Sequence, residues 1–98
     1  MNLAAFYHSG MYPEIYAPDR FHLRFSFRVA SGDIEACTLV YFHKNHREET
    51  TKEERMSERY HLGSSVVYVA VVSFQKPARY LQYYFRVTGK DGETRWYN

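Results

Sequence analysis

Pro77-Ala78-Arg79-Tyr80-Leu81-Gln82-Tyr83-Tyr84-Phe85-Arg86-Val87-Thr88-Gly89 is the stretch that decides the fold. From Leu81 to Val87 every second side chain is apolar or aromatic, and Gln, Tyr and Arg stand between them. A period of two predicts a half-buried β-strand, because successive strand side chains point to opposite faces. The turn Gly89-Lys90-Asp91-Gly92 follows, and Glu93 to Tyr97 resumes a β-prone run. Asp-Gly between two such runs predicts an antiparallel hairpin at the end of the chain.

Three further runs show strand character. Arg20 to Val29 alternates apolar with polar residues, and Ile34 to Phe42 is apolar on both faces in its second half, which predicts a central strand. Val66 to Phe74 is rich in β-branched residues and carries no charge, so we expect both of its faces to be covered. Together these runs predict an all-β protein, an antiparallel, immunoglobulin-like β-sandwich of six to eight strands.

The N-terminal part has weaker patterns. Leu3 to His8 is short, apolar and aromatic, and we expect a first strand at a sheet edge. Ile15 to Asp19 is expected to be irregular, because Pro13 and Pro18 exclude an interior strand.

A charged excursion covers residues 44–62. Arg47 to Arg59 holds four basic and five acidic residues, and Thr51-Lys52-Glu53-Glu54 has the form of a capping box. Like charges four residues apart oppose a long helix. We therefore expect a solvated segment with one or two helical turns.

Composition limits the class of protein. The 98 residues fit one domain, 1–98, and 45% of them are apolar. Ten Tyr, seven Phe and one Trp favour a recognition module, although tyrosines can equally fill a thin core with their hydroxyls at its rim. A net charge of +2 is too small to imply a nucleic-acid partner.

Targeting signals are not evident in the sequence. Cys37 is the single cysteine, so no intramolecular disulfide can form. No apolar run reaches the length of a membrane span, and the first residues do not resemble a signal peptide. We expect a cytoplasmic protein without a membrane partner.

Catalytic and metal-binding patterns are also weak. His43 and His46 have a possible ligand spacing, but no nearby residues complete a site, so we expect exposed histidines and no metal or cofactor. The acids outside the excursion lie at turns, strand ends or beside prolines, and Cys37 lies in a core strand where thiols are usually inert. The chain alone is therefore not expected to be an enzyme.

Surface recognition remains as the kind of function that the sequence favours. The strand patterns place a mixed set of aromatic and cationic side chains on faces turned away from the core: Arg24, Arg28, Arg79, Arg86, Tyr80, Tyr84 and Trp96. Flat aromatic rings suit sugar rings and equally suit nucleic-acid bases, and such a face can also dock onto another domain.

Several short motifs in order resemble one family. They are Ala5-Phe6-Tyr7-His8, the Tyr12-Pro13 to Tyr16 segment, Asp19 to Phe25, Gly32-Asp33-Ile34 with Thr38 to Tyr41, Arg79 to Phe85, and Trp96-Tyr97. This order resembles the N-terminal domain of neopullulanases, cyclomaltodextrinases and maltogenic amylases of the α-amylase family. The segment from His43 to Leu62 departs from the pattern, because it lacks the Trp that relatives commonly carry there.

The resemblance implies a β-sandwich that precedes a catalytic (β/α)8 barrel, in which the catalytic acids lie. It further implies weak binding of α-glucan or cyclodextrin, contact with that barrel and a possible homodimer. We expect the sugar-contacting residues to be Tyr41, Tyr84 and Trp96, followed by Tyr12 and Tyr16.

The alternative function is a small module that binds single-stranded nucleic acid. It would use Arg24, Arg28, Arg86 and the tyrosines, and its affinity would fall steeply with salt.

Overall fold

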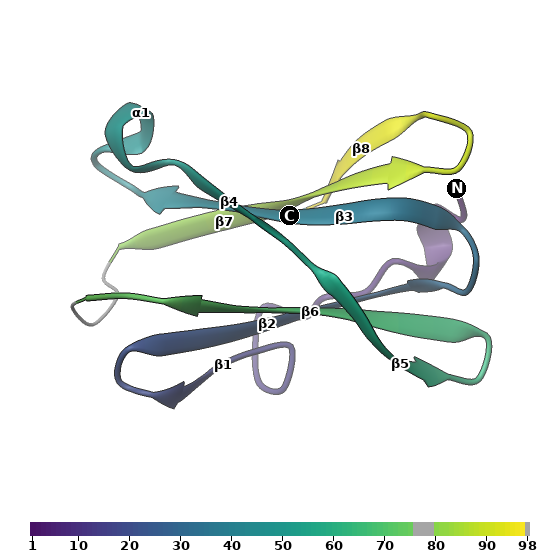
Figure 1. Cartoon of the computed structure of the whole chain (residues 1–98), viewed down its shortest axis with the longest axis horizontal. Coiled ribbons are helices and arrows are strands. Elements are labelled where there is room, and N and C mark those ends of the chain that lie inside the picture. The colour runs from purple at the N-terminus through teal and green to yellow at the C-terminus, as the bar shows by residue number, and fades with distance from the viewer. Residues whose placement is uncertain (76–79, 98) are drawn as a thin grey trace.

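The computed structural model describes residues 1–75 and 80–97, and it confirms the predicted antiparallel β-sandwich (Figure 1). One sheet has the order β1-β2-β6-β5. Its strands are β1 (Ile15–Asp19), β2 (His22–Ala30), β5 (Ser57–Leu62) and β6 (Ser65–Ser73). We call it the first sheet.

The second sheet has the order β4-β3-β7-β8 and also consists of four antiparallel strands. Its strands are β3 (Ile34–His43), β4 (Lys52–Arg55), β7 (Leu81–Gly89) and β8 (Thr94–Tyr97). The central position predicted for the Ile34–Phe42 run is confirmed, because β3 lies between β4 and β7.

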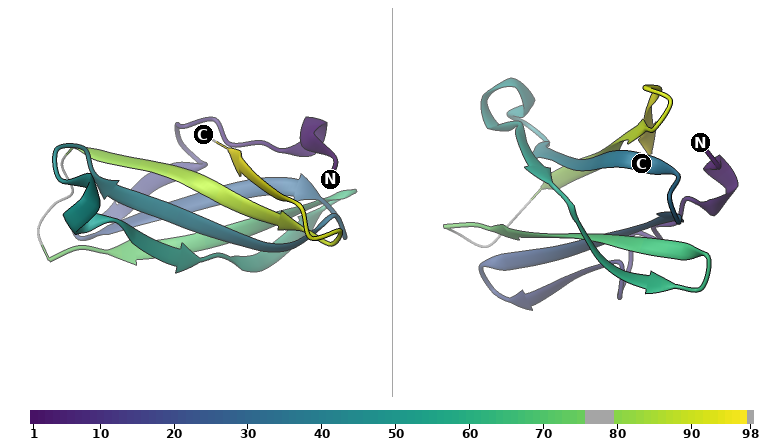
Figure 2. Two further views of the ribbon diagram at one scale, coloured as in Figure 1. Left: turned by 90° about the horizontal axis from the view of Figure 1, so that it is seen from above. Right: turned by 45° about the vertical axis from the view of Figure 1, so that its right-hand side comes forward.

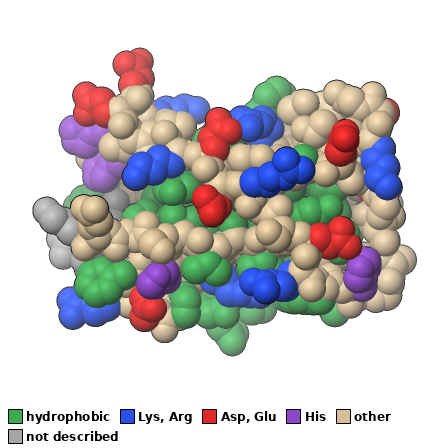
Figure 3. All heavy atoms as spheres, in the orientation of Figure 1, with side chains coloured by type: hydrophobic (Ala, Val, Ile, Leu, Met, Phe, Trp, Pro, Cys, Tyr) green, Lys and Arg blue, Asp and Glu red, His purple; other side chains and the backbone are tan. Residues whose placement is uncertain are grey.

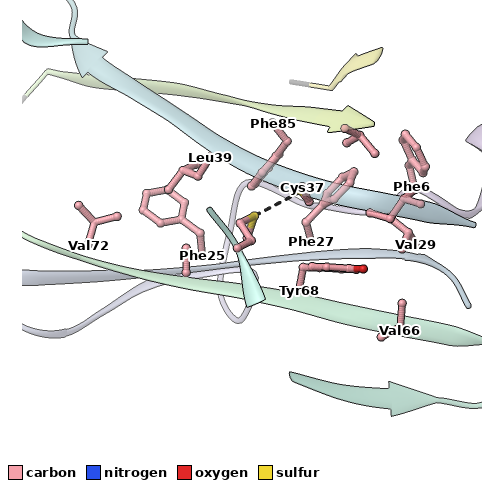
Figure 4. Close-up of a cluster of buried hydrophobic side chains, with 14 residues drawn as sticks. Phe6, Phe25, Phe27, Val29, Cys37, Leu39, Val66, Tyr68, Val72 and Phe85 are labelled. Carbon is pink, nitrogen blue, oxygen red and sulfur yellow. Dashed lines mark hydrogen bonds between the residues drawn. The ribbon is translucent and has the colours of Figure 1, made fainter. Parts of the chain in front are cut away.

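The core lies between the inward faces of β2, β3, β6 and β7 (Figure 4). Phe25 and Phe27 of β2, Leu39 of β3 and Phe85 of β7 have no solvent exposure. The rings of Phe27 and Phe85 stack across the two sheets with centroids 4.7 Å apart. Each buried side chain of this size contributes roughly 1.5–3 kcal/mol of transfer free energy, so the observed register is strongly preferred over a slip by one residue.

The C-terminal hairpin is as predicted. Leu81, Tyr83, Phe85 and Val87 face the core, and Gly92 adopts a φ of +84° in the turn between β7 and β8. The amide of Gly92 donates a hydrogen bond to the carbonyl oxygen of Gly89, over 3.0 Å. The quoted residues Pro77 to Arg79 lie outside the described part of the chain.

The charged segment is solvated and has one helical turn, as predicted, but the prediction missed two strands in it. Only Arg47–Thr50 (α1) is helical, and Thr51 ends this helix instead of opening one. The residues that follow form β4 and β5, which pair with β3 and β6 in different sheets. Every residue of both strands is exposed, so no apolar period marks them as strands in the sequence.

One residue connects these two edge strands. Met56 follows β4 directly and precedes β5, and its side chain is 3% exposed. Its amide donates to the carbonyl oxygen of Cys37, over 2.9 Å. The chain therefore passes from one sheet to the other at a single buried residue. The right-hand view of Figure 2 shows the backbone crossing between the two sheets. Figure 3 looks onto this side, where acidic and basic side chains are interspersed.

The N-terminal segment also differs from the prediction of an edge strand. Leu3–Ala5 (η1) is a short 3-10 helix, and only an isolated bridge joins Tyr7 to Arg28 of β2. The cause is Phe6, whose buried ring packs against Phe27 of the first sheet and Tyr97 of the second. The segment therefore anchors a side chain between the sheets and does not run along an edge.

The stretch from Ile15 to Asp19 is a strand, where we expected an irregular piece. It lies at the edge of the first sheet, and its register with β2 shifts between Tyr16 and Asp19. An edge strand tolerates Pro18, because its missing N–H is not needed for a second neighbour. Among residues 1–75 and 80–97, no helix is long and apolar enough to cross a membrane.

Candidate functional site

Tyr84 and Trp96 share the outer face of the second sheet. Tyr84 lies opposite Val40 of β3, and Trp96 lies opposite Arg86. Directly paired residues point to the same side of a sheet, and Phe85 between Tyr84 and Arg86 points into the core. The register makes Tyr84 and Trp96 diagonal neighbours on adjacent strands, within reach of aromatic side chains.

An open hollow of about 720 Å³ lies beside this pair. Tyr84, Gln82 and Trp96 line it, and Phe42 and Arg47 line its far side. The guanidinium carbon of Arg47 lies 4.6 Å from the centre of the Phe42 ring, so helix α1 contributes to the wall. The Trp96 side chain is 64% exposed and offers a ring face to a ligand.

An ion pair crosses the same outer face. Arg86 of β7 donates two hydrogen bonds to the carboxylate of Glu53 of β4, over 2.7 and 3.2 Å. These hydrogen bonds lower the pKa of Glu53, so the carboxylate stays charged well below neutral pH. The pair orients the Arg86 guanidinium and compensates its charge, which suits a neutral polar ligand better than an anion.

Tyr41 lies on the other face of the second sheet. It is paired with Tyr83, and its ring packs 6.1 Å from that of Phe74 at the margin of the core. Burial raises the pKa of its hydroxyl. The structure therefore does not bring Tyr41 to the hollow beside Tyr84 and Trp96.

Tyr12 and Tyr16 form a separate aromatic pair on the outer face of the first sheet. Their ring centroids are 5.3 Å apart, and Tyr12 is 76% exposed. Tyr16 is paired with Arg24, whose guanidinium carbon lies 5.6 Å from the Tyr16 ring centre. The five expected sugar-contacting residues are thus divided among three places in the fold.

The arginines of the alternative function are likewise divided. Arg28 packs over Tyr7, 4.7 Å from its ring centre, and shares the outer face of the first sheet with Arg24. Arg86 lies on the outer face of the second sheet, on the opposite side of the sandwich. The three side chains do not form one continuous basic strip along which a nucleic-acid backbone could run.

His8 is a residue to which the sequence analysis gave no role. Its Nδ1 lies 2.8 Å from the carbonyl oxygen of Ser26 in β2, and its Nε2 lies 2.7 Å from the hydroxyl of Tyr83 in β7. A carbonyl only accepts, so in the neutral ring Nδ1–H donates to Ser26 and Nε2 accepts from Tyr83. Burial lowers the pKa of His8. No sequence signal marks this link, because its partners are far away along the chain.

The residues with reactive or ligating side chains are dispersed. The rings of His43 and His46 are 5.1 Å apart, but no group of three potential metal ligands occurs within the described ranges. Cys37 is fully buried as predicted, and burial raises the pKa of its thiol to about 12. Its sulfur lies 3.5 Å from that of Met56, so packing in the core explains the presence of a cysteine at this position.

Comparisons with known proteins identify relatives of the whole chain. The family model described as "Alpha amylase, N-terminal ig-like domain" matches residues 1–98. A comparison with curated protein sequences found no match.

Two solved structures share the fold. A cyclomaltodextrinase is similar over 99% of this chain and 16% of its own, with a TM-score of 0.89 and 22% identity. The type III pullulan hydrolase from Thermococcus kodakarensis is similar over 85% of this chain and 12% of its own, with a TM-score of 0.64 and 18% identity. The chain therefore spans less than a fifth of the length of either protein.

Proposed function

The chain belongs to the family of alpha-amylase N-terminal Ig-like domains, and from this membership we propose that it is the non-catalytic N-terminal module of a longer α-glucan-degrading enzyme. The parent protein would resemble neopullulanases and cyclomaltodextrinases, which act on α-1,4 and α-1,6 linkages. The module binds α-glucan or cyclodextrin weakly and contacts the catalytic barrel or a second copy.

The hollow beside Tyr84 and Trp96 is the observation that carries glucan binding. Both rings line it from the outer face of the second sheet, and the rim offers Gln82 and Arg47 as hydrogen-bond donors. The electron-rich face of an aromatic ring attracts the C–H face of a glucose unit. The hollow is open and shallow, so we expect affinity in the millimolar range, roughly −4 kcal/mol.

Titration with β-cyclodextrin tests this site directly. Trp96 is the single tryptophan, so its fluorescence reports on ligand at this position alone. We expect saturable quenching or enhancement in the wild-type chain. Tyr84→Ala should weaken binding about 30-fold or more, because truncating a central aromatic contact commonly costs about 2 kcal/mol.

Tyr12→Ala provides the matched control, because Tyr12 is an exposed aromatic residue that packs against Tyr16 of the first sheet. It should leave the titration unchanged. Calorimetry on Trp96→Ala, which lacks the fluorophore, should show no heat of binding. An absent response at millimolar cyclodextrin would refute glucan binding by this module. Equal losses of affinity in Tyr12→Ala and Tyr84→Ala would mean that the sugar binds elsewhere.

The outer face of the first sheet supports the contact role. Several of its large side chains are exposed: Tyr7, Tyr12, Tyr60, Leu62 and Val71. Exposed apolar groups that gather on one face are typical of interfaces. Val71→Glu in the longer protein should reduce association with a second copy, measured by sedimentation, and leave cyclodextrin binding at Trp96 intact.

A further inference from the structure

A small hollow lies on the outer face of the first sheet. Its volume is about 160 Å³, well below the roughly 300 Å³ at which typical small-molecule pockets begin. A space of this size suits one amino-acid side chain and not an oligosaccharide. Its two buried lining residues form the floor: Ser26 of β2, which is 7% exposed, and Val67 of β6, which is 5% exposed. The neighbours of Ser26 in β2 point into the core, so Ser26 itself points outward.

Two arginines of β2 line the hollow on either side of Ser26. Arg24 and Arg28 share its outward direction, because each lies two residues away on the same strand. The guanidinium carbon of Arg28 lies 4.7 Å from the ring centre of Tyr7. That of Arg24 lies 5.6 Å from the ring centre of Tyr16. Packing over a tyrosine ring restrains each guanidinium and keeps its N–H groups available for a ligand.

The positive charge of this site is not compensated by an ion pair. Within residues 1–75 and 80–97, no ion pair includes Arg24 or Arg28. Glu14 is the one acidic residue that lines the hollow, and it forms no ion pair with either arginine. The lining therefore carries two positive charges and one negative charge. This differs from the second sheet, where Glu53 compensates Arg86.

Apolar and aromatic side chains surround the charged groups. The register places Tyr7 beside Arg28 at one end of the row across the sheet, and Tyr60 beside Val67 at the other end. Leu62 lines the hollow next to Tyr60, and both are exposed. Arginine and tyrosine are enriched in protein interfaces, where surrounding apolar contacts exclude water from a central polar pair. An ion pair that forms here is strengthened when the partner displaces water.

We infer that this hollow binds a glutamate or aspartate side chain at the surface of a protein partner, with Arg24 and Arg28 supplying the countercharge. The planar carboxylate matches the N–H edge of a guanidinium, which can donate two hydrogen bonds to it. The inference goes beyond the proposed function, because the site lies wholly within the 98-residue chain and requires neither glucan nor a catalytic barrel. A nucleic-acid backbone fits less well, because it presents phosphates in a row and Arg86 lies on the opposite sheet.

Two blocked dipeptides test the inference without any sugar. N-acetyl-leucyl-glutamate amide carries the carboxylate, and N-acetyl-leucyl-glutamine amide has nearly the same shape without the charge. We expect the glutamate peptide to shift the backbone amide NMR signals of Ser26 and Val67 saturably. The glutamine peptide should bind about three- to fivefold more weakly, which is the size of effect that an exposed ion pair gives.

Variants of the lining residues show whether the arginines are responsible. Arg24→Gln and Arg28→Gln should each reduce the affinity for the glutamate peptide and leave that for the glutamine peptide unchanged. Arg20→Gln is the matched control, because Arg20 also packs over an aromatic ring, that of Phe21 at 5.5 Å, but does not line the hollow. Glu14→Gln should increase the affinity for the glutamate peptide, because it removes the negative charge of the lining.

Equal affinity for the two dipeptides would overturn the inference. Equal losses in Arg20→Gln and Arg28→Gln would also overturn it, because general attraction to a basic protein would then explain the binding. Displacement of the glutamate peptide by an equimolar oligothymidine would assign the site to nucleic acid and refute the inference as well. A glutamate-specific response in a chain that gives no Trp96 response to cyclodextrin would refute glucan binding and leave this site standing.

Discussion

The two long sides of the sandwich are finished in different ways. On one side the chain passes from β4 to β5 and thereby joins the edges of both sheets through Met56 alone. On the other side Leu81 and Tyr83 of β7 border two hollows. The most highly charged segment of the chain closes the first side. The second side is open, although its strand is one of the most aromatic segments.

This difference shows that closing the edge of a sandwich and supplying its apolar side chains are separate properties of the chain. β4 and β5 have no buried residue, yet their backbones pair along two sheets and one methionine fills the space between them. The region around Leu81 has aromatic and aliphatic side chains in abundance, yet Leu81 and Tyr83 border two hollows. Apolar content alone therefore does not decide where this core meets solvent.

The largest expected effect is on the closed side. Met56→Ala should lower the free energy of unfolding by about 2–5 kcal/mol, because it leaves a cavity against Cys37. Urea unfolding measures the loss, and the rate of Cys37 labelling by a thiol reagent should rise with it. Met11→Ala, at a side chain that is 68% exposed, is the control and should change stability by less than about 0.5 kcal/mol. Equal effects of the two substitutions would mean that Met56 does not seal this side.

A smaller effect is expected on the open side. Leu81→Ala removes a partly buried side chain that already borders two hollows, so no closed cavity forms. We expect a loss of about 1 kcal/mol in the same urea experiment. A loss as large as that of Met56→Ala would show that the open side contributes as much to stability as the closed one.

The smallest effect concerns His8, which links β2 to β7 across the interior. Burial holds its pKa below the ordinary value of 6.5, so the unfolded chain takes up the proton first. The stability contributed by the neutral ring is complete above pH 6.5 and is lost as the pH falls through the lower pKa of the folded state. Urea unfolding between about pH 5 and about pH 8 should show this decrease, and His8→Gln should remove this part of the slope. An unchanged pH profile in the variant would contradict the assignment.

The sequence predicted the interior of this fold better than its sides. β2, β3, β6 and β7 carry runs whose periodicity follows directly from burial on one or both faces. β4 and β5 are exposed at every residue, so their strand state depends on pairing with β3 and β6, which no local pattern records. Phe21 fits the period of β2 but is 41% exposed, because the strand begins one residue later.

The candidate site was predicted only in part, for a related reason. Tyr84 and Trp96 are neighbours because β7 and β8 form the hairpin that the Asp-Gly turn predicted. Tyr41 lies in a stretch that is apolar on both faces, so periodicity could not assign its side. His8 owes its position to the packing of Phe6 between the sheets, which is a tertiary contact.

The crossing at Met56 fixes the number of residues between β4 and β5. Arg55 ends a strand of one sheet and Ser57 begins a strand of the other, so one residue spans the gap between them. Removing or inserting a residue here would pull one edge strand out of alignment and turn its side chains over. The turn at Gly63 joins neighbouring strands of the same sheet and can lengthen freely. Insertions and deletions among related chains should therefore occur in such turns and not at this crossing, whose length sets the spacing between the two sheets.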